Sequence, residues 1–294
     1  MRPISDEEGS VRFLAALLFW LATTVLLAVA VPAAWAQQTV VSEDGYAGLA
    51  AEAANNPQLQ EAMASELATQ ITALAKDSGY ELNNTGLVRG VTAAYTANSG
   101  FPGQFAQANR IAHRWMFTDA VQHDQSDENR WFVDIAPMLK DESLQQTLGN
   151  LNLDVPDTLT VPITVPELSA LRPGQLRTLS TWGPLVSIAA CVLTGIFALL
   201  TLASARQRGK ALAALGVSAL LVGATGWAAI EVGRRYVDDA LNSTTGDIRT
   251  VADVMVDTAE ASLHHWLNLT LAVGGVLAIF GVLVSVLGAL RRSV

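Results

Sequence analysis

Four long apolar runs interrupt an otherwise polar chain. They cover residues 13–35, 182–203, 211–230 and 266–290, and none of them contains an acidic, basic or histidine side chain. Each run has about 20 residues or more, which as a helix is enough to cross a hydrocarbon core. Helix is the expected state, because the bilayer interior offers no water to open backbone groups. The pattern therefore predicts four transmembrane helices.

The fold class that follows is an all-α membrane protein, with a mostly helical and slightly β domain between the first two transmembrane helices. The expected segments are a cytoplasmic tail (1–12), transmembrane helix 1 (13–36), an extracytoplasmic domain (37–180), transmembrane helix 2 (181–203), a cytoplasmic loop (204–210), transmembrane helix 3 (211–230), an extracytoplasmic helical hairpin (231–265), transmembrane helix 4 (266–290) and a cytoplasmic tail (291–294).

The charges predict which side of the membrane each segment occupies. Of the 27 acidic residues, 17 lie within residues 37–180 and seven within residues 231–265. Residues 204–210 carry three bases and no acid, and two arginines lie close to the C-terminus. Basic residues in short loops mark the cytoplasmic side of a membrane. We therefore expect a plasma membrane protein whose large acidic segment lies outside the cytoplasm.

The first apolar run has two interpretations. Ala34, Trp35 and Ala36 before Gln37 resemble a small-residue signal peptidase site. The run is longer than a usual signal core, however, and an acidic tail precedes it. We predict an uncleaved signal anchor. Cleavage after Ala36 is the alternative, and it would leave three helices without changing the orientation of the rest.

Helix start signals and apolar periodicity predict four helices at the beginning of the large polar segment. Ser42 precedes two acids, and Asn56 precedes Pro57, so both places fit a helix N-terminus. A third helix is expected over residues 85–97 and a fourth from Pro102. The helix that starts at Pro57 should end near a glycine at position 79.

Later in the same segment the pattern changes to short strands. Residues 130–135 alternate apolar and polar side chains, which is typical of a strand. Residues 158–165 are rich in β-branched side chains but contain proline, so a strand there should be an edge strand. A short helix is expected between them, over residues 137–148.

The second polar segment predicts a helical hairpin. The third membrane helix should continue to about Leu241, since opposite charges recur there at i,i+4. After a turn, residues 247–265 read as an amphipathic helix. The spacing of its polar side chains would suit a divalent cation. We favour the interpretation that these side chains form the solvent-exposed face of the helix, and we predict no metal site. The stripe consists of Asp253, Asp257, Glu260 and His264.

No catalytic motif is present. A nucleophile elbow, a P-loop, a dinucleotide-binding glycine pattern and a CxxC pair are all absent. The sequence predicts no enzyme, no catalytic residue and no cofactor. The apolar runs carry no ionisable group, which argues against an autonomous ion transporter. The single cysteine, Cys191, leaves the polar domain to fold by packing alone.

Two sets of glycines recur every seven residues in the last two membrane helices. Seven residues make two turns, so each set lies on one stripe, and small residues let helix backbones approach closely. We predict that the two helices pack through these stripes. The glycines are Gly209, Gly216 and Gly223 in one helix and Gly274, Gly281 and Gly288 in the other.

A polar group in the fourth helix of the domain is the candidate interaction site. Asn109, Arg110 and His113 lie within little more than one turn, among small apolar residues. A buried guanidinium or imidazole needs a partner, and Asp134 on the first strand is the expected one. We hypothesise an Arg110–Asp134 pair, with His113 as a second donor, that clamps the strand unit onto the helices. An exposed binding patch is the alternative.

The same region carries a family resemblance. Residues 101–113 (FPGQFAQANRIAH) and 133–137 (VDIAP), with similar runs at 44–46 and 56–60, resemble the four-helix conserved membrane proteins of actinobacteria. That family has an F-x-x-x-aromatic-x-x-A-N-R-x-A-H segment and a V-D-L-x-P-like segment. Phe105 stands where tryptophan is expected, and Ile135 where leucine is expected. The resemblance covers most of the chain and implies topology and host, since the family carries no assigned activity.

The expected function is that of a non-enzymatic protein of the bacterial cell envelope, whose outer domain is a protein-interaction or assembly module. The expected partners are membrane lipid and another envelope or membrane protein, and no nucleic acid. Two alternatives stay open: an accessory subunit of a transport or export complex, and an envelope enzyme with an unrecognised site. The oligomeric state is open as well.

Overall fold

The structure is a computed structural model that describes residues 4–77, 85–117, 131–134, 160–163, 176–242, 244 and 246–290. The chain divides into two compact units. The membrane unit consists of Met1–Gln37, Thr181–Tyr236 and Glu260–Val294. The polar unit consists of Gln38–Ser180 and Val237–Ala259.

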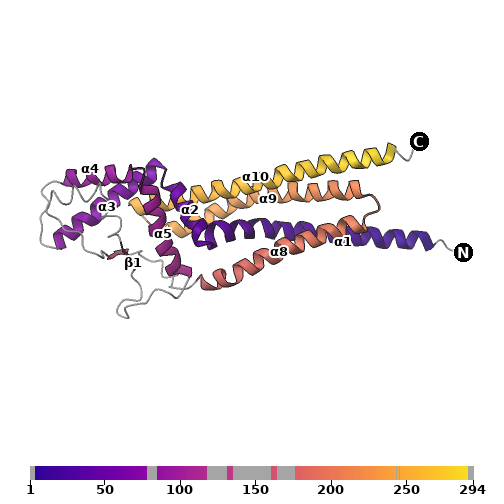
Figure 1. The fold of residues 1–294 in the computed structure, drawn as a ribbon, viewed down its shortest axis with the longest axis horizontal. Coiled ribbons are helices and arrows are strands. Elements are labelled where there is room, and N and C mark those ends of the chain that lie inside the picture. Colours follow the sequence, from indigo (N-terminus) through magenta and orange to yellow (C-terminus); the bar gives the residue numbers. More distant parts are fainter. Residues whose placement is uncertain are drawn as a thin grey trace. The chain divides into compact units, whose positions relative to one another are not determined.

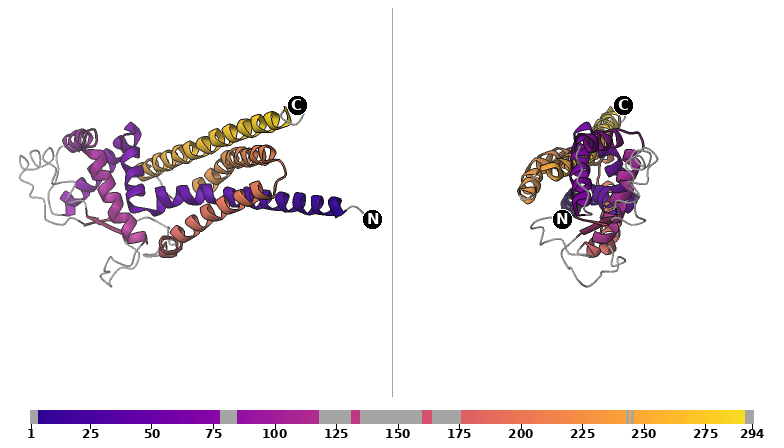
Figure 2. Two further views of the ribbon diagram at one scale, coloured as in Figure 1. Left: turned by 45° about the vertical axis from the view of Figure 1, so that its right-hand side comes forward. Right: turned by 90° about the vertical axis from the view of Figure 1, so that its left-hand side faces the viewer.

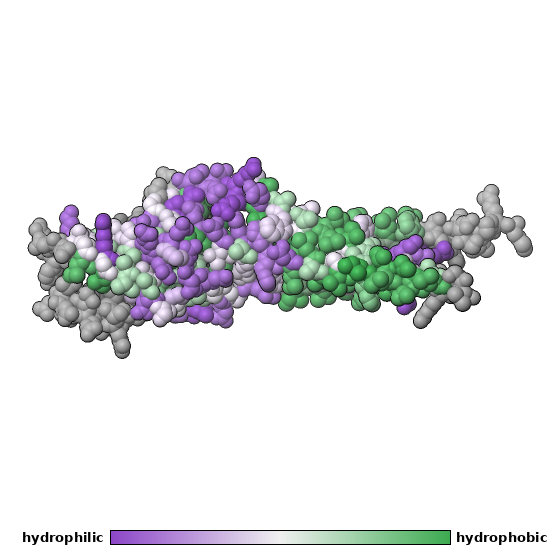
Figure 3. Space-filling view, turned by 90° about the horizontal axis from the view of Figure 1, so that it is seen from above, coloured by the Kyte–Doolittle hydropathy of each residue, from purple (hydrophilic) through white to green (hydrophobic). Residues whose placement is uncertain are grey.

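Four helices are long and apolar enough to cross a membrane, which confirms the multi-pass architecture (Figure 1). They are α1 (Ile4–Ala36), α8 (Arg177–Ser204), α9 (Arg208–Leu241) and α10 (Gly246–Leu290). Many large apolar side chains on these helices are exposed, and Figure 3 shows the continuous hydrophobic surface that they form. Such a surface is costly in water and is the expected surface toward lipid.

Polar groups join α1 to α9 inside the membrane unit. The indole Nε1 of Trp20 donates to the carbonyl oxygen of Ala214 at 2.9 Å. One turn further on, the hydroxyls of Thr24 and Ser218 are 2.7 Å apart. Hydrogen bonds between helices and small residues at the contact are the usual means of association where lipid removes the hydrophobic driving force.

The helices α9 and α10 touch at the backbone through paired glycines. A Cβ atom built on Gly209 would lie 2.8 Å from the carbonyl oxygen of Gly281. One built on Gly216 would lie 2.7 Å from the carbonyl oxygen of Gly274, and the reverse distance is 2.9 Å. Real Cβ atoms do not come this close to a backbone oxygen. Only glycine at these positions allows the observed approach of the two helices.

The remaining two glycines of the predicted stripes behave differently. Gly223 faces the side chain of Leu271, whose Cγ would lie 2.6 Å from an added Cβ. Gly288 has no described heavy atom within 4 Å of an added Cβ, beyond its own helix backbone. The prediction that Gly288 packs against the third membrane helix therefore receives no support from the geometry.

The polar unit begins with four helices that follow a π-helical turn, η1 (Gln37–Val41), at the end of α1. They are α2 (Glu43–Ala53), α3 (Pro57–Asp77), α4 (Thr85–Thr96) and α5 (Phe101–Phe117). The predicted helices over this part of the chain are thereby confirmed, within a residue or two at the ends that the structure describes. The expected end of the second of them near position 79 lies outside the described residues.

Local capping explains where α2 and α3 begin. The Ser42 hydroxyl accepts the N–H of Gly45 at 3.3 Å and so satisfies a free donor of the first turn of α2. The Asn56 side chain accepts the N–H of Gln58 at 2.9 Å, and Pro57 opens α3, where its missing N–H costs nothing.

Two short strands follow. β1 (Trp131–Asp134) pairs antiparallel with β2 (Thr160–Ile163), and Trp131 lies opposite Ile163. They fall inside the two segments predicted as strands. Among the described strands β2 pairs only with β1, and a proline is tolerated there because a strand with one partner has a free edge. The helix predicted over residues 137–148 lies outside the described residues.

The core of the polar unit joins segments from both polar parts of the sequence. Leu59 and Phe101 are almost fully buried, and Phe101 packs edge-on against Tyr95 with 5.7 Å between ring centroids. Val254, from the first part of α10, is buried in the same cluster. The sequence predicts residues 37–180 and 231–265 as separate segments, whereas in the structure Val254 and its neighbours in residues 237–259 complete the core of the domain.

Candidate functional site

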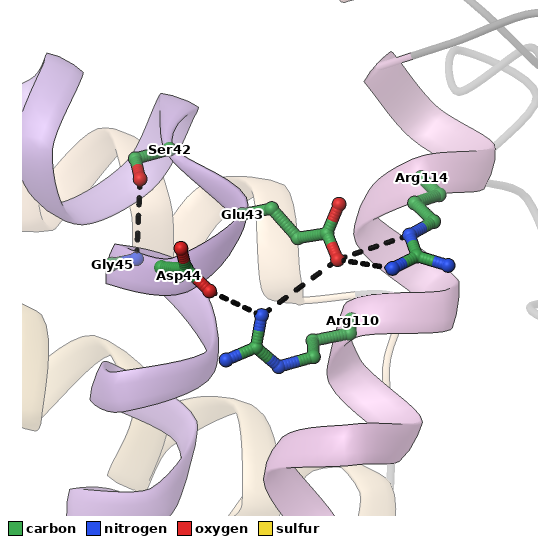
Figure 4. Close-up of polar contacts among 6 residues, drawn as sticks. All are labelled: Ser42, Glu43, Asp44, Gly45, Arg110 and Arg114. Carbon is green, nitrogen blue, oxygen red and sulfur yellow. Dashed lines mark hydrogen bonds and ion pairs between the residues drawn. The ribbon is translucent and has the colours of Figure 1, made fainter.

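Two arginines of α5 face two acids of α2 (Figure 4). The Nη1 of Arg110 forms an ion pair with Asp44 and lies 3.7 Å from the Oε1 of Glu43. Arg114 donates to the same Glu43 oxygen from Nη2 at 2.7 Å and from Nε at 3.0 Å. We call these four residues, Glu43, Asp44, Arg110 and Arg114, the charge cluster.

The local sequence explains the arrangement of the charge cluster. Glu43 and Asp44 occupy the first turn of α2, where the helix dipole favours negative charge. Arg110 and Arg114 are four residues apart and so share one face of α5. The hydrogen bond from Arg114 holds the pKa of the Glu43 carboxyl below its ordinary value, although partial burial opposes the shift. Glu43 therefore contributes stability that is lost as the pH falls through its lowered pKa.

His113 anchors α5 to the π-helical turn. The residue is only 4% exposed, and its Nε2 lies 3.0 Å from the carbonyl oxygen of Val40. The ring stacks on Phe117, with centroids 4.1 Å apart, and lies 5.4 Å from the ring of Tyr46. An imidazole that is buried, stacked and hydrogen-bonded to a main-chain group is a packing element rather than an accessible base.

Close backbone contact holds the same turn against α2. A Cβ atom built on Gly45 would overlap the carbonyl group of Gln38. The chain therefore folds back tightly between η1 and α2. From α5, His113 contacts η1, and the two arginines of the charge cluster contact α2. Together these contacts form a clamp on the segment that leads from the first apolar helix into the polar unit.

The predicted site residues contribute unequally to this clamp. Arg110 and His113 belong to it, while Asn109 donates to the carbonyl oxygen of Phe105 in its own helix at 2.9 Å. The carboxylate partners that the structure gives Arg110 are Asp44 and Glu43. The side chain of Asp134 lies outside the described residues, so its pair with Arg110 stays a prediction.

The acidic stripe of α10 does not gather around a possible cation. Asp253 accepts from Arg249 at 2.9 Å, and Glu260 accepts from Arg234 of α9 at 2.8 Å. His264 stacks on Trp227 with ring centroids 3.9 Å apart. Within the described part of the chain, no group of three or more potential ligands could hold a metal ion. Asp257 has a contact of its own as well.

We predict that Arg110 couples energetically to Asp44. The guanidinium is about one-third exposed and Asp44 is largely exposed, so Arg110→Ala should cost less than about 1 kcal/mol of unfolding free energy. A double-mutant cycle with Asp44→Ala should be non-additive, because each change removes the same contact. Thermal unfolding of the full chain in mild detergent measures the coupling. A parallel cycle of Arg110→Ala with Asp134→Ala tests the partner that the sequence suggested. If the Asp44 cycle were additive and the Asp134 cycle were not, Asp134 rather than Asp44 would be the partner of Arg110.

We also predict that acid weakens the clamp through His113. Burial lowers the pKa of its imidazole, against a smaller opposing effect of the Val40 carbonyl and the Glu43 charge. The unfolded chain therefore takes up the proton first, and stability falls as the pH drops from about 7 through the ordinary histidine pKa, until the folded state is protonated too. Melting temperatures from about pH 8 to 5 should show this slope. His113→Gln should flatten it, and His265→Gln, at an exposed position, should not.

Comparison with known proteins adds no relative. No family model matches the chain, and neither a curated protein nor a solved structure matches it. The class of the protein therefore rests on its own architecture. It is a multi-pass membrane protein with four helices able to span a bilayer and a separate, mostly helical polar unit.

Proposed function

We propose that the protein is a non-enzymatic component of a bacterial cell envelope, with its polar unit outside the cytoplasm acting as an interaction or assembly module. The main support for this topology is the core of the polar unit, which both acidic segments share. Val254 packs with Leu59 and Phe101, so the two acidic segments lie on the same side of the membrane. In the sequence, the two membrane helices α8 and α9 lie between these two acidic segments.

The bases near the link between α8 and α9 support the same topology. Arg12, before the first apolar run, lines one pocket together with Arg206 of the short link between α8 and α9 and Lys210 in the first turn of α9. The N-terminal end of α1 and this link therefore lie at one end of the unit. Since short basic loops face the cytoplasm, this end is the cytoplasmic one and the polar unit is extracytoplasmic.

The contacts of the polar unit favour binding over catalysis. Arg110 and His113 of the 101–113 motif, with the adjoining Arg114, act on the fold, because they hold α5 against η1 and α2. The two acidic segments together carry 24 acidic and 11 basic residues. A folded, strongly acidic domain attached to four spans suits a protein partner with a basic face, since complementary charge guides association. The resemblance of the motif to actinobacterial membrane proteins makes an actinobacterial plasma membrane the proposed host.

Photocrosslinking in intact cells tests the proposal. A photoreactive residue at Glu61 on α3 or at Arg89 on α4, both exposed, should yield one discrete crosslinked protein. The reversal Glu61→Lys should reduce its yield if the partner face is basic. A crosslinker at Gln207, in the link at the other end, is the control. Diffuse crosslinking at every position of the polar unit would count against an interaction module.

The same experiment separates the two alternatives. A transport accessory subunit should crosslink to an ATPase or channel subunit, and the control at Gln207 should then be positive. If the protein is instead an envelope enzyme, a photoreactive residue should yield no discrete crosslinked protein at any position.

A further inference from the structure

A pocket of about 550 Å³ lies inside the membrane unit, between α1, the end of α8 and the start of α9. Its volume falls in the range of small-molecule sites, about 300–1,000 Å³. The short link between α8 and α9, residues 205–207, also lines the pocket, and its course can be followed in Figure 2. All the lining residues belong to the membrane unit, so the pocket is a feature of one compact body.

One end of the pocket is positively charged. Arg12 of α1, Arg206 of the link and Lys210 of α9 line it, and all three are exposed. Among the side chains that the structure describes, which begin at residue 11, no carboxylate forms an ion pair with any of them. Each base also borders an apolar run, Arg12 before the first, Arg206 after the second and Lys210 before the third. The charges therefore gather at the level where a bilayer carries its headgroups.

The rest of the pocket is mostly apolar, and its other polar lining residues are Thr201, Ser204 and Gln207. Phe13, Leu17 and Trp20 of α1 form one wall, and alanines of α1 and α9 leave the space between the helices open. The one polar atom of the Trp20 ring already donates to Ala214, so the ring offers the pocket only its apolar surface. A bound molecule therefore needs an anionic end for the three bases and a hydrocarbon part for the groove.

We propose that this pocket binds one anionic phospholipid, with the phosphate at Arg12, Arg206 and Lys210 and an acyl chain along Phe13, Leu17 and Trp20. Clustered bases next to membrane helices recognise anionic lipid headgroups. A soluble phosphate would satisfy the charges but not the groove, and a zwitterionic lipid would satisfy the groove but not the charges. The inference does not depend on the interaction role of the polar unit.

Native mass spectrometry of the full chain in mild detergent tests the site. The probes are dioleoyl phosphatidylglycerol and dioleoyl phosphatidylcholine, which differ in headgroup charge and share their chains. We expect one tightly bound phosphatidylglycerol, and about fivefold weaker binding for each charge removed by Arg12→Gln, Arg206→Gln or Lys210→Gln. Arg208→Gln is the matched control, because Arg208 adjoins the same link but does not line the pocket. The affinity of Arg208→Gln for phosphatidylglycerol should stay within about twofold of that of the unsubstituted chain.

Two further measurements keep the test independent of folding and of charge alone. Ala16→Phe fills the groove without touching a charge, and it should weaken phosphatidylglycerol binding while leaving the melting temperature of the lipid-free protein unchanged. Glycerol phosphate, added as the soluble headgroup, should not compete. Equal binding of the two lipids, an equal loss in Arg208→Gln, or no effect of Ala16→Phe would overturn the proposal, and effective competition by glycerol phosphate would replace the lipid with a soluble anion.

Discussion

Gly45→Ala should destabilise the polar unit by about 3 kcal/mol or more, near the upper end for an overpacked site. The added methyl would overlap the carbonyl group of Gln38, and a main-chain group cannot rotate away. Either α2 or the π-helical turn must shift, and such a shift would also disturb the contacts of Ser42 and His113. Thermal unfolding of the full chain in mild detergent measures the loss.

Gly48→Ala is the matched control in the same helix. An added Cβ there meets no heavy atom within 4 Å among the described residues, beyond the backbone of its own helix. Alanine is the better helix former, so this variant should be more stable by about 0.5–1 kcal/mol. Opposite signs for the two variants are the expected result. A similar effect of both would mean that α2 does not approach Gln38.

Gly216→Leu and Gly281→Leu should each strain the membrane unit by about 1–3 kcal/mol. An added Cβ on Gly216 would overlap the backbone nitrogen of Ala278, and one on Gly281 would overlap that of Ala213. The two helices can accept a side chain only by moving apart. Melting temperature in detergent is again the measurement, because close helix packing supplies much of the stability of such a unit.

Leucine substitutions at three other glycines should show smaller losses of stability in the same experiment. Gly223→Leu meets the flexible side chain of Leu271 and should cost less than the backbone overlaps. Gly275→Leu and Gly288→Leu meet no described heavy atom within 4 Å outside the backbone of their own helix, and should be close to neutral. A uniform loss across all five variants would point to a general intolerance of leucine, and no loss in any would contradict close packing of α9 on α10.

Local features of the fold could be predicted from the sequence. The four apolar helices follow from length and the absence of charge, and the starts of α2 and α3 follow from Ser42 and Asn56–Pro57. Each of these signals consists of residues within, or directly next to, the helix that it predicts. The same holds for the strand segments, since alternation and β-branching are properties of the segment itself.

Long-range pairing could not be predicted in the same way. Glu43 was recognised as a helix-start acid, but nothing in its neighbourhood indicates an arginine 71 residues away. Charge pairs near the end of α9 were expected at i,i+4, whereas Arg234 pairs with Glu260 and Arg249 with Asp238, across the hairpin. Periodicity places side chains on a face of a helix, but the partner of that face depends on the tertiary fold.

The glycine stripes show the same limit. Spacing by seven identified the face of α9 and α10 that carries Gly216, Gly274 and Gly281. It does not tell how far along each helix the contact extends, and Gly288 lies beyond it. Similarly, the apolar face of residues 247–265 was recognised, but that Val254 completes the core around Leu59 is visible only in the structure.

Single-cysteine labelling in intact cells tests the proposed topology most directly. In a Cys191→Ala background, cysteines at Glu61 on α3 and at Gln207 between α8 and α9 are both exposed. A membrane-impermeant maleimide should label the cysteine at 61 in intact cells, and label the one at 207 only after the membrane is permeabilised. Labelling at 207 and none at 61 in intact cells would contradict the account, because the polar unit would then lie in the cytoplasm.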